Sequence, residues 1–488
     1  MAAYHAAMLL DTDAAYLALK ARDARFDGRF FVGVTSTGIY CRPVCRVRTP
    51  RRENCRFFGT RAQAEAAAFR PCMKCRPEIA PGLSLMDSSR SLADSAAQLI
   101  EQAVHEGQDL PMPQLAARLG VTDRHLRRIF QAAHGVGPLD FLTTQRLLLA
   151  KQLLSDTTQP ITQVALASGF QSLRRFNAAF VQRYRFSPSQ LRREGEVRSG
   201  GDVLRLAWRP PYDVPAMLGF FERRALQGVE EVQGLELRRT LALAHHGQPL
   251  QGWLRARFVP EQHEVHLSTS ESLQPALAAV LQRMRQAFDL DADPSLIDPV
   301  MALLPLPHRP GARLPGAVDG FEVAVRIILG QQVTVKAART LVQRLVNRYG
   351  QPIPTPYPAL THLFPDAATL ATADAEVVGR LGIVRQRVKA LQALATAVAS
   401  GHITLHRGAP LQPTRDALKA LPGIGDWTAQ LIALRALAWP DAWPASDIGL
   451  MNVLGSRDPK HITALAEPWR PWRGYAVMRL WHRVETLE

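Results

Sequence analysis

All five cysteines of the 488-residue chain lie in one short segment, and four of them have a spacing suited to a metal ion. Cys41 and Cys45 form one close pair, and Cys72 and Cys75 form a second pair. Two close pairs supply the four thiolates that tetrahedral Zn²⁺ requires, so we predict one zinc ion bound by this quartet. Two disulfides are the alternative. Cys55 has no near partner and is expected to be a small buried apolar residue.

A glycine-rich turn in KALPGIGDWTAQLIALRAL lies between two expected helices. Gly423 and Gly425 would let the backbone approach a phosphate closely, and the helix that follows would direct free N–H groups at it. Alone, this helix-hairpin-helix pattern indicates a protein that binds the DNA backbone. Asp447, in WPASDIGL, follows Gly425 by 22 residues. A single aspartate before a helix is usually an N-cap, so a catalytic role needs more support.

Two further segments share a layout typical of a helix-turn-helix. Each has a short helix with an alanine pair, then Gly120 or Gly169 at the turn, then a helix opened by Thr122 or Ser172, which are good N-caps. Arginines near the start of such helices can reach base edges or phosphates in the major groove. The alternative is a pair of basic hairpins that pack against partner domains. The arginines in question are Arg124, Arg127, Arg128, Arg174 and Arg175.

The patterns divide the chain into four units, so we predict a multidomain, mainly α protein. Residues 1–85 would form a small α/β zinc domain, and residues 88–193 an all-α double helix-turn-helix. The polar, glycine-rich stretch 194–202 is typical of a linker. Residues 203–290 alternate apolar and polar positions, which predicts an antiparallel-sheet subdomain of α+β type. Residues 291–488 carry long amphipathic runs and are expected to be all-α.

Composition favours a polyanionic partner. The formal net charge is +16, and neutralising phosphates with basic side chains releases counterions. A merely soluble basic protein is the alternative on charge alone. Double-stranded DNA fits the charge, and the family resemblances given next imply both damaged and promoter DNA. No membrane is expected, because no long uninterrupted apolar segment is present. The N-terminal residues are a poor signal peptide, so a reducing cytoplasmic location is expected.

The runs FFVGVTSTGIYCRPVC, ENCRFFGT and AEAAAFRPCMKCRP closely resemble the N-terminal zinc domain of the adaptive-response (Ada) regulators. The resemblance implies that Cys41 is both a zinc ligand and a sacrificial nucleophile, which takes a methyl group from a methylphosphotriester in DNA. A structural zinc site with an inert Cys41 is the alternative.

The paired helix-turn-helix segments, which end in RYRFSPSQLRR, resemble an AraC-type regulator. This resemblance implies transcription activation, with RNA polymerase as a candidate partner. The alkylguanine methyltransferase domain usual in Ada regulators, with its Pro-Cys-His-Arg motif, is absent from the sequence, so repair of alkylated guanine oxygen is not expected.

The stretches WRPPYDVPAMLGFFERRAL, DGFEVAVRIILGQQVTV and EPWRPWRGYAVMRLW resemble the AlkA-type 3-methyladenine DNA glycosylase II of the helix-hairpin-helix superfamily, over residues 203–488. The resemblance implies that Asp447 is catalytic and that Trp427 and Trp481 line the base pocket, with Tyr475 as a weaker candidate. It also places Gln332 where relatives carry an apolar residue that fills the gap left by the flipped base.

Two absences narrow the expected chemistry. Trp427 stands where strand-cutting relatives carry a Schiff-base lysine, which predicts a monofunctional hydrolase. The four C-terminal cysteines of an iron–sulfur cluster are absent, so no cluster is expected. Leu431 stands at a position where relatives carry an aromatic pocket residue, so we expect the substrate range to differ from theirs.

Together these features predict a DNA-3-methyladenine glycosylase II joined to a stoichiometric methylphosphotriester-DNA methyltransferase and a DNA-binding regulator. The alternative is an alkylation-responsive transcription regulator whose glycosylase half only binds damage.

Overall fold

The structure is a computed structural model that describes residues 12–22, 26, 30–45, 47–59, 61–72, 74–75, 77, 85–106, 110–157, 159–194, 203–245 and 248–485. Helices predominate over two small sheets, which confirms the predicted multidomain, mainly α class. Apart from Glu194, the predicted linker lies outside the described residues.

The first unit is a small sheet with two short helices. Its strands lie in the order β3-β1-β2-β4, with β1 antiparallel to both neighbours and β2 parallel to β4. Phe31 and Val32 are adjacent in β1 but belong to different apolar clusters, because successive side chains of a strand point to opposite faces. The elements are α1 (Thr12–Ala21), β1 (Phe31–Val34), β2 (Ile39–Cys41), η3 (Arg52–Asn54), β3 (Cys55–Phe58), α2 (Arg61–Ala66) and β4 (Arg70–Pro71).

The second unit is all helical. Both predicted N-caps are confirmed: the hydroxyl of Thr122 accepts from His125 N at 3.3 Å, and that of Ser172 accepts from Arg175 N at 3.3 Å. Gly120 turns the chain before the first of these helices with φ +67°. The helices are α3 (Leu85–Glu106), α4 (Met112–Arg118), α5 (Asp123–His134), α6 (Pro138–Asp156), α7 (Ile161–Ala167), α8 (Leu173–Tyr184) and α9 (Pro188–Glu194).

The third unit contains a five-stranded sheet in the order β5-β9-β8-β7-β6, and every pairing in it is antiparallel, as predicted. Alternate residues of β8 are buried, since only one face of the sheet packs on the core. The elements are β5 (Leu204–Ala207), α10 (Val214–Arg224), β6 (Glu230–Gln233), β7 (Glu236–His245), β8 (Gln248–Val259), η4 (Pro260–Gln262), β9 (Glu264–Thr269), η5 (Glu271–Ala276) and α11 (Leu277–Ala287).

The fourth unit is helical, and turns break its long amphipathic runs. The first run divides into two helices at residues 330–334, where Thr334 caps the second helix by accepting from Ala337 N at 3.2 Å. Gly382, with φ +90°, divides the other run. The helices are α12 (Pro294–Met301), α13 (Gly320–Leu329), α14 (Val335–Tyr349), α15 (Ala367–Ala371), α16 (Ala375–Arg380), α17 (Arg385–Ala399), α18 (Leu411–Lys419), α19 (Asp426–Arg435), α20 (Ile448–Leu454), α21 (Pro459–Leu465), η6 (Glu467–Trp469) and α22 (Arg473–Glu485).

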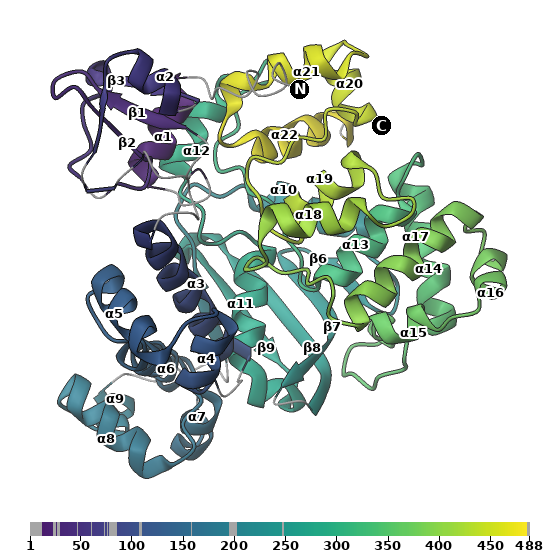
Figure 1. The fold of residues 1–488 in the computed structure, drawn as a ribbon. Helices are drawn as coiled ribbons and strands as arrows, with labels where there is room; N and C mark the ends of the chain where they lie inside the picture. The colour runs from purple at the N-terminus through teal and green to yellow at the C-terminus, as the bar shows by residue number, and fades with distance from the viewer. Residues whose placement is uncertain are drawn as a thin grey trace.

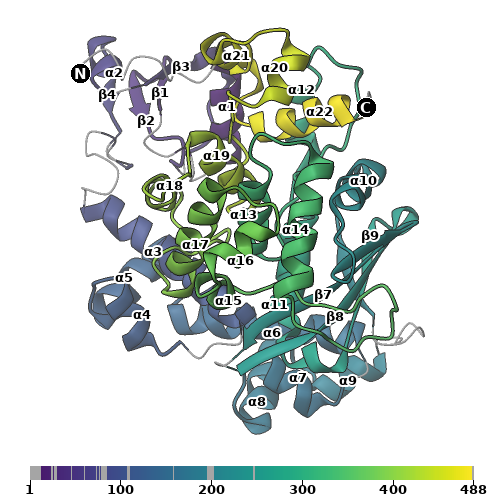
Figure 2. The same ribbon diagram turned by 90° about the vertical axis from the view of Figure 1, so that its right-hand side faces the viewer.

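The zinc unit and the distal end of the helix-turn-helix unit lie far apart. Figures 1 and 2 both place the zinc unit at the top and helices α8 and α9 at the bottom. The first unit, which holds the four clustered cysteines, contacts the fourth unit (residues 291–488), called the helical unit from here on. The contact joins α1 to η6, and the rings of Phe26 and Trp439 lie 5.9 Å apart. Among the described residues, no helix is both long enough and apolar enough to span a bilayer.

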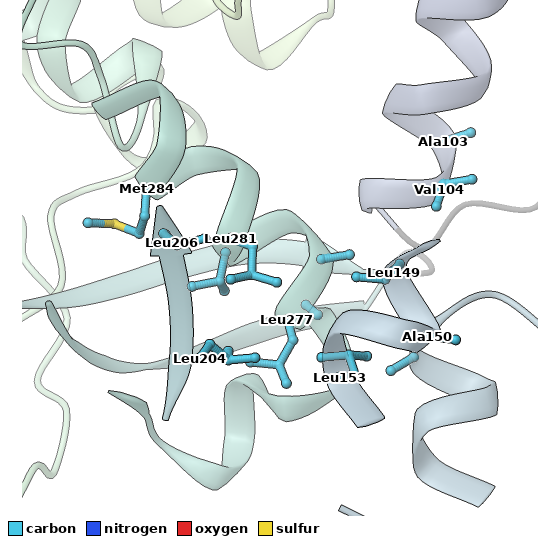
Figure 3. Close-up of a cluster of buried hydrophobic side chains, with 14 of the residues drawn as sticks. Ala103, Val104, Leu149, Ala150, Leu153, Leu204, Leu206, Leu277, Leu281 and Met284 are labelled. Carbon is cyan, nitrogen blue, oxygen red and sulfur yellow. The ribbon is translucent and has the colours of Figure 1, made fainter. Parts of the chain in front are cut away.

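The helix-turn-helix unit and the sheet unit share one hydrophobic core. Leu153 of α6 is fully buried, and the apolar faces of α3 and α6 meet β5 and α11 (Figure 3). Side chains of α6 also hydrogen-bond the backbone of β5: Gln152 Nε2 donates to Arg205 O, and Arg205 N donates to Asp156 Oδ2, both at 3.3 Å. The labelled side chains are Ala103, Val104, Leu149, Ala150, Leu153, Leu204, Leu206, Leu277, Leu281 and Met284.

Leu153→Ala is therefore expected to reduce the free energy of unfolding by about 2–5 kcal/mol, through lost burial and a residual cavity. Leu148→Ala is the matched control, because Leu148 lies on the same helix but is 51% exposed. The control should change stability by no more than about 0.5 kcal/mol. Denaturant unfolding of the full chain measures both, and equal effects would contradict the shared core.

Candidate active site and metal centre

A cavity of about 1140 Å³ lies between the sheet unit and the helical unit. Its wall is built from α10, α13, the 330–334 turn, α19, α20 and α22. A cavity of this size can enclose a group as large as a nucleoside. The residues that sequence reasoning singled out and that the structure brings to this wall are Gln332, Gly423, Trp427, Leu431, Asp447 and Trp481.

Asp447 is held in one orientation by three N–H donors. Its Oδ1 accepts from Leu450 N at 3.1 Å and from Trp481 Nε1 at 3.0 Å. Its Oδ2 accepts from Trp427 Nε1 at 2.9 Å. The residue is thus the N-cap of α20 and also a nearly buried part of the cavity wall, 7% exposed. An ionised carboxylate satisfies all three donors, because it offers only acceptors.

The two tryptophans come from helices far apart in sequence. Trp427 lies in the first turn of α19 and Trp481 near the end of α22, and both are half-buried in the cavity wall. Their indole N–H groups both point at Asp447, so they fix the carboxylate and also provide aromatic surface beside it. Sequence reasoning expected the aromatic surface and missed the hydrogen bonds.

Tyr475 does not lie where it was expected. It is 3% exposed and outside the cavity wall, and its hydroxyl donates to Asp289 Oδ2 at 2.7 Å. Burial raises the pKa of Asp289, and the bond from Tyr475 partly offsets that rise. The ring therefore supports the interface between α22 and the end of α11, and the substrate-binding role does not fit its position.

The glycine-rich turn forms a hairpin between α18 and α19. Gly423 has φ +77°, and a Cβ atom there would lie 3.0 Å from the Cβ of Ala390, so the turn packs closely on α17. Gly425 is the N-cap of α19 and faces open space, which leaves its backbone accessible. Ile424 between them is buried and anchors the turn to the core. The hairpin thus presents backbone outward beside the cavity.

Buried ion pairs lie deep in the cavity wall, and sequence reasoning missed them. Glu322 of α13 accepts from Arg239 of β7 at 2.6 Å and from Arg326 at 2.6 Å. Although burial opposes it, the two guanidinium groups hold the pKa of Glu322 below its usual value. Arg326 also bonds Glu230 at 2.7 Å. The sequence does contain an indication of these ion pairs: Glu322 and Arg326, four residues apart, are charged residues in an otherwise apolar helix.

Arg435 lies in the same wall and has a different environment. Burial, followed by repulsion from Arg224 and Arg326, lowers its pKa to about 9. Its guanidinium lies 4.6 Å from the ring centre of Phe220 and donates to the carbonyl oxygens of Pro315 and Gly316.

The arginines of the second unit are exposed on α5 and α8. Arg127 pairs with Asp123 at 2.9 Å, and Arg128 Nη2 lies 3.3 Å from His125 Nδ1. All five remain at the surface, where they can meet an anionic partner, although far from the cavity (Figure 1). They are Arg124, Arg127, Arg128, Arg174 and Arg175.

The four predicted cysteine ligands converge. The Sγ atoms of Cys41, Cys45, Cys72 and Cys75 all lie within 4.8 Å of one another. Thiolates on one tetrahedral zinc ion lie about 3.8 Å apart, so the group fits Zn²⁺. Hydrogen-bonding contacts with Cys45 and Cys75, and then burial, raise the pKa of Cys41, because both favour the neutral thiol over the thiolate. A divalent cation would remove that penalty.

Cys55 lies apart from this group, as expected. It is buried in β3, its Sγ donates to Arg51 O at 3.3 Å, and burial raises its pKa. It therefore behaves as a small buried thiol.

Comparison with known families accounts for most of the chain. Residues 14–78 match the metal binding domain of Ada, and residues 115–194 match a helix-turn-helix domain. Residues 203–319 match the AlkA N-terminal domain, and residues 325–461 match the HhH-GPD superfamily of base excision DNA repair proteins. The Ada match and the clustered sulfurs together support a zinc site of four cysteines.

Cys72→Ser should abolish stoichiometric zinc, because three thiolates bind it far more weakly than four. Cys55→Ser is the matched control, since that cysteine lies outside the cluster. Metal analysis of the purified full chain is expected to give one zinc per chain for the wild type and the control. Loss of zinc in the control, or its retention in Cys72→Ser, would contradict the assignment.

Related proteins resemble the chain over its parts and over its whole length. DNA-3-methyladenine glycosylase 2 of Escherichia coli is 35% identical over 57% of the chain and 96% of its own length. Regulatory protein ada of Salmonella typhimurium is 32% identical over 39% of the chain and 51% of its own length. A probable bifunctional transcriptional activator/DNA repair enzyme AlkA of Mycobacterium tuberculosis is 38% identical over 97% of both chains. This match spans all four units in order, so the chain belongs to the family of bifunctional transcriptional activator/DNA repair enzymes of the AlkA type.

Proposed function

We propose that the chain excises alkylated bases of the 3-methyladenine kind from double-stranded DNA by hydrolysing the N-glycosidic bond. The observation that carries this proposal is the Asp447 carboxylate, held by two indole N–H groups in a large cavity beside an exposed hairpin. The hairpin would bind the DNA backbone, and the cavity would receive a base flipped out of the duplex.

The rim of the cavity suits contact with an opened duplex. Four of its side chains are large, apolar and more than one third exposed, and apolar side chains gathered at one rim are typical of a surface that a partner covers. Sugar rings and base faces offer the matching apolar surface. These side chains are Val333, Val335, Val384 and Ile448.

Recognition follows from the charge of the substrate. An alkylated purine is cationic at neutral pH, and the aromatic faces of Trp427 and Trp481 would attract it by about 0.5–2 kcal/mol. Leu431 contributes an apolar wall where relatives carry an aromatic ring. Gln332 would fill the gap that the flipped base leaves in the duplex.

The chemical step needs one carboxylate and one water molecule. The bond between the sugar C1′ and the base nitrogen breaks, and its electron pair neutralises the positive base, which leaves without protonation. Asp447 stabilises the positive charge that develops on the sugar. Water then forms the new C1′–O bond and loses its proton to the carboxylate or to solvent. Trp427 cannot form an imine with the sugar, which favours a monofunctional enzyme, and no iron–sulfur cluster is required.

Asp447→Asn is expected to reduce base release from methylated duplex DNA by at least about 100-fold, because the variant lacks the negative charge that stabilises the transition state. DNA affinity should stay near the wild-type value. Asp458→Asn is the matched control, because Asp458 is also an N-cap, of the neighbouring helix α21, and is exposed. Asparagine caps a helix as well as aspartate does, so the capping bond should be kept in both variants. Asp447→Asn also loses one acceptor for an indole N–H, which costs about 1–3 kcal/mol of stability, so folding of that variant is verified by denaturant unfolding.

A wild-type chain that binds methylated DNA without releasing bases would instead support a regulator whose C-terminal half only senses damage. Equal loss of activity in Asp447→Asn and Asp458→Asn would show that the effect comes from helix capping and that Asp447 has no catalytic role.

We further propose that Cys41 accepts a methyl group from a methylphosphotriester. Its Sγ would attack the methyl carbon, forming an S–C bond while the O–C bond breaks and its electrons stay on the phosphate, which becomes an anionic diester. Cys41, Cys45, Cys72 and Cys75 would hold Zn²⁺, which would keep their sulfurs deprotonated at neutral pH. The triester carries no charge that would repel the thiolate. The exposed arginines of α5 and α8 would hold promoter DNA.

Methylation of Cys41 should increase affinity for promoter DNA, because the four-thiolate site changes from −2 to −1. At 6 Å and an effective dielectric of 20, one unit of repulsion is worth up to about 3 kcal/mol, and salt reduces this to about 1 kcal/mol. Titration of a target duplex with unmodified and methylated protein, at low and moderate salt, measures the effect. Cys55→Ser should respond like the wild type, and equal affinities in both states would rule out the switch.

A further inference from the structure

Gln331 joins three elements at the mouth of the cavity. Its Nε2 donates to Gly423 O at 3.0 Å and to Thr428 Oγ1 at 2.9 Å, which ties the 330–334 turn to the hairpin and to α19. Its own carbonyl oxygen accepts from the guanidinium of Arg387, at the start of α17. The side chain is half-buried, and both of its amide hydrogens are used.

The next residue has a backbone conformation that needs outside support. Gln332 has φ +55°, in the left-handed region that a non-glycine side chain rarely adopts, and it is exposed at the cavity rim. Such a conformation persists only where the surrounding structure enforces it. Because Gln331 is fixed on both its side chain and its carbonyl, the turn cannot relax without breaking contacts to the hairpin and α17.

The hairpin turn is fixed to the same helix. Gly423 approaches Ala390 of α17 so closely that a Cβ atom would contact it at 3.0 Å, and Gln386 O at 3.4 Å. The hairpin backbone proposed to bind DNA and the side chain proposed to fill the gap are therefore held by the same set of contacts. A displacement of either would disturb the bonds of Gln331.

We propose that Gln331 is a positioning residue that holds Gln332 in its left-handed conformation, so that hairpin binding to the DNA backbone and filling of the gap occur together. The inference rests on the proposed base-excision function. Gln331 itself touches neither the base nor the sugar. Its contribution is to the extrusion of the base, and the chemical step at Asp447 is not affected.

A double-mutant cycle tests this coupling in the full chain. Gln331→Leu removes the two amide bonds, and Gln332→Ala removes the gap-filling side chain. Single-turnover base release from a methylated duplex should fall at least about 10-fold in each single variant. In the Gln332→Ala background, Gln331→Leu should lower the rate of base release by less than a further factor of about 3, because the effects of two residues that act as a unit are not additive. Effects that multiply would overturn the proposal.

Further measurements separate positioning from damage to the fold. Thr428→Val removes one partner of Gln331 with little change of volume, and it should slow release in the wild-type background but not with Gln332→Ala. Gln343→Leu is the matched control, since Gln343 makes similar bonds between α14 and Gln227, outside the cavity wall. It should leave release within about 2-fold of wild type, as expected for a site away from the reaction.

The substrate provides the last criterion. A lesion opposite a mismatch is extruded more easily, so it should restore much of the rate to Gln331→Leu. Affinity for an undamaged duplex should stay within about 3-fold, because no base is extruded from it and no gap opens. No rescue, or a comparable loss of affinity for the undamaged duplex, would overturn the positioning role. If the wild type released no base, the proposed function itself would fail; a multiplicative cycle with an active wild type would reject only this inference.

Discussion

A buried set of ion pairs between the sheet unit and the helical unit fixes the geometry on which the cavity depends. Arg239 comes from β7, whereas Glu322 and Arg326 come from α13. The side chains of Arg239 and Glu322 are almost completely removed from solvent, and that of Arg326 is partly buried. Removing one partner would leave an uncompensated buried charge, which costs about 3–5 kcal/mol. Sheet and helices therefore have one favourable arrangement, and the space between them keeps a defined shape.

The chemical site is built on top of this frame. α19 and α22 each provide a tryptophan, and the turn before α20 provides Asp447. Both indole N–H groups are bonded to the carboxylate, so its position is set by packing of two helices and not by its own flexible side chain. Such preorganisation suits a group whose charge is needed in the transition state. The same bonds explain why one residue can cap a helix and still face a cavity.

The four units are connected by more than sequence order. Leucines of α6 and β5 lie in the same core, so the surface carrying the exposed arginines of α5 and α8 has a fixed relation to the sheet unit. The zinc unit packs on the other end of the molecule through α1 and Phe26. The units therefore keep a defined arrangement relative to one another.

Local chemistry is what the sequence determined by itself. Motifs whose residues lie close together in the sequence can be recognised directly. They include the two cysteine pairs, the N-caps Thr122 and Ser172, and the glycines of the hairpin with Asp447 22 residues later. The class of fold and the family followed from these motifs, and the comparisons confirmed both. The assignment of individual site residues remained a prediction.

Long-range pairings were decided only by the tertiary structure. Tyr475 donates a hydrogen bond to Asp289, which lies 186 residues earlier in the sequence, and this contact places the ring outside the cavity wall where it was expected. Gln331 meets the hairpin across 92 positions, and Arg239 meets Glu322 across 83. No periodicity or spacing marks such partners, because each depends on how whole helices and strands pack. Their energies are set by burial and hydrogen-bond geometry, which exist only once the chain has folded.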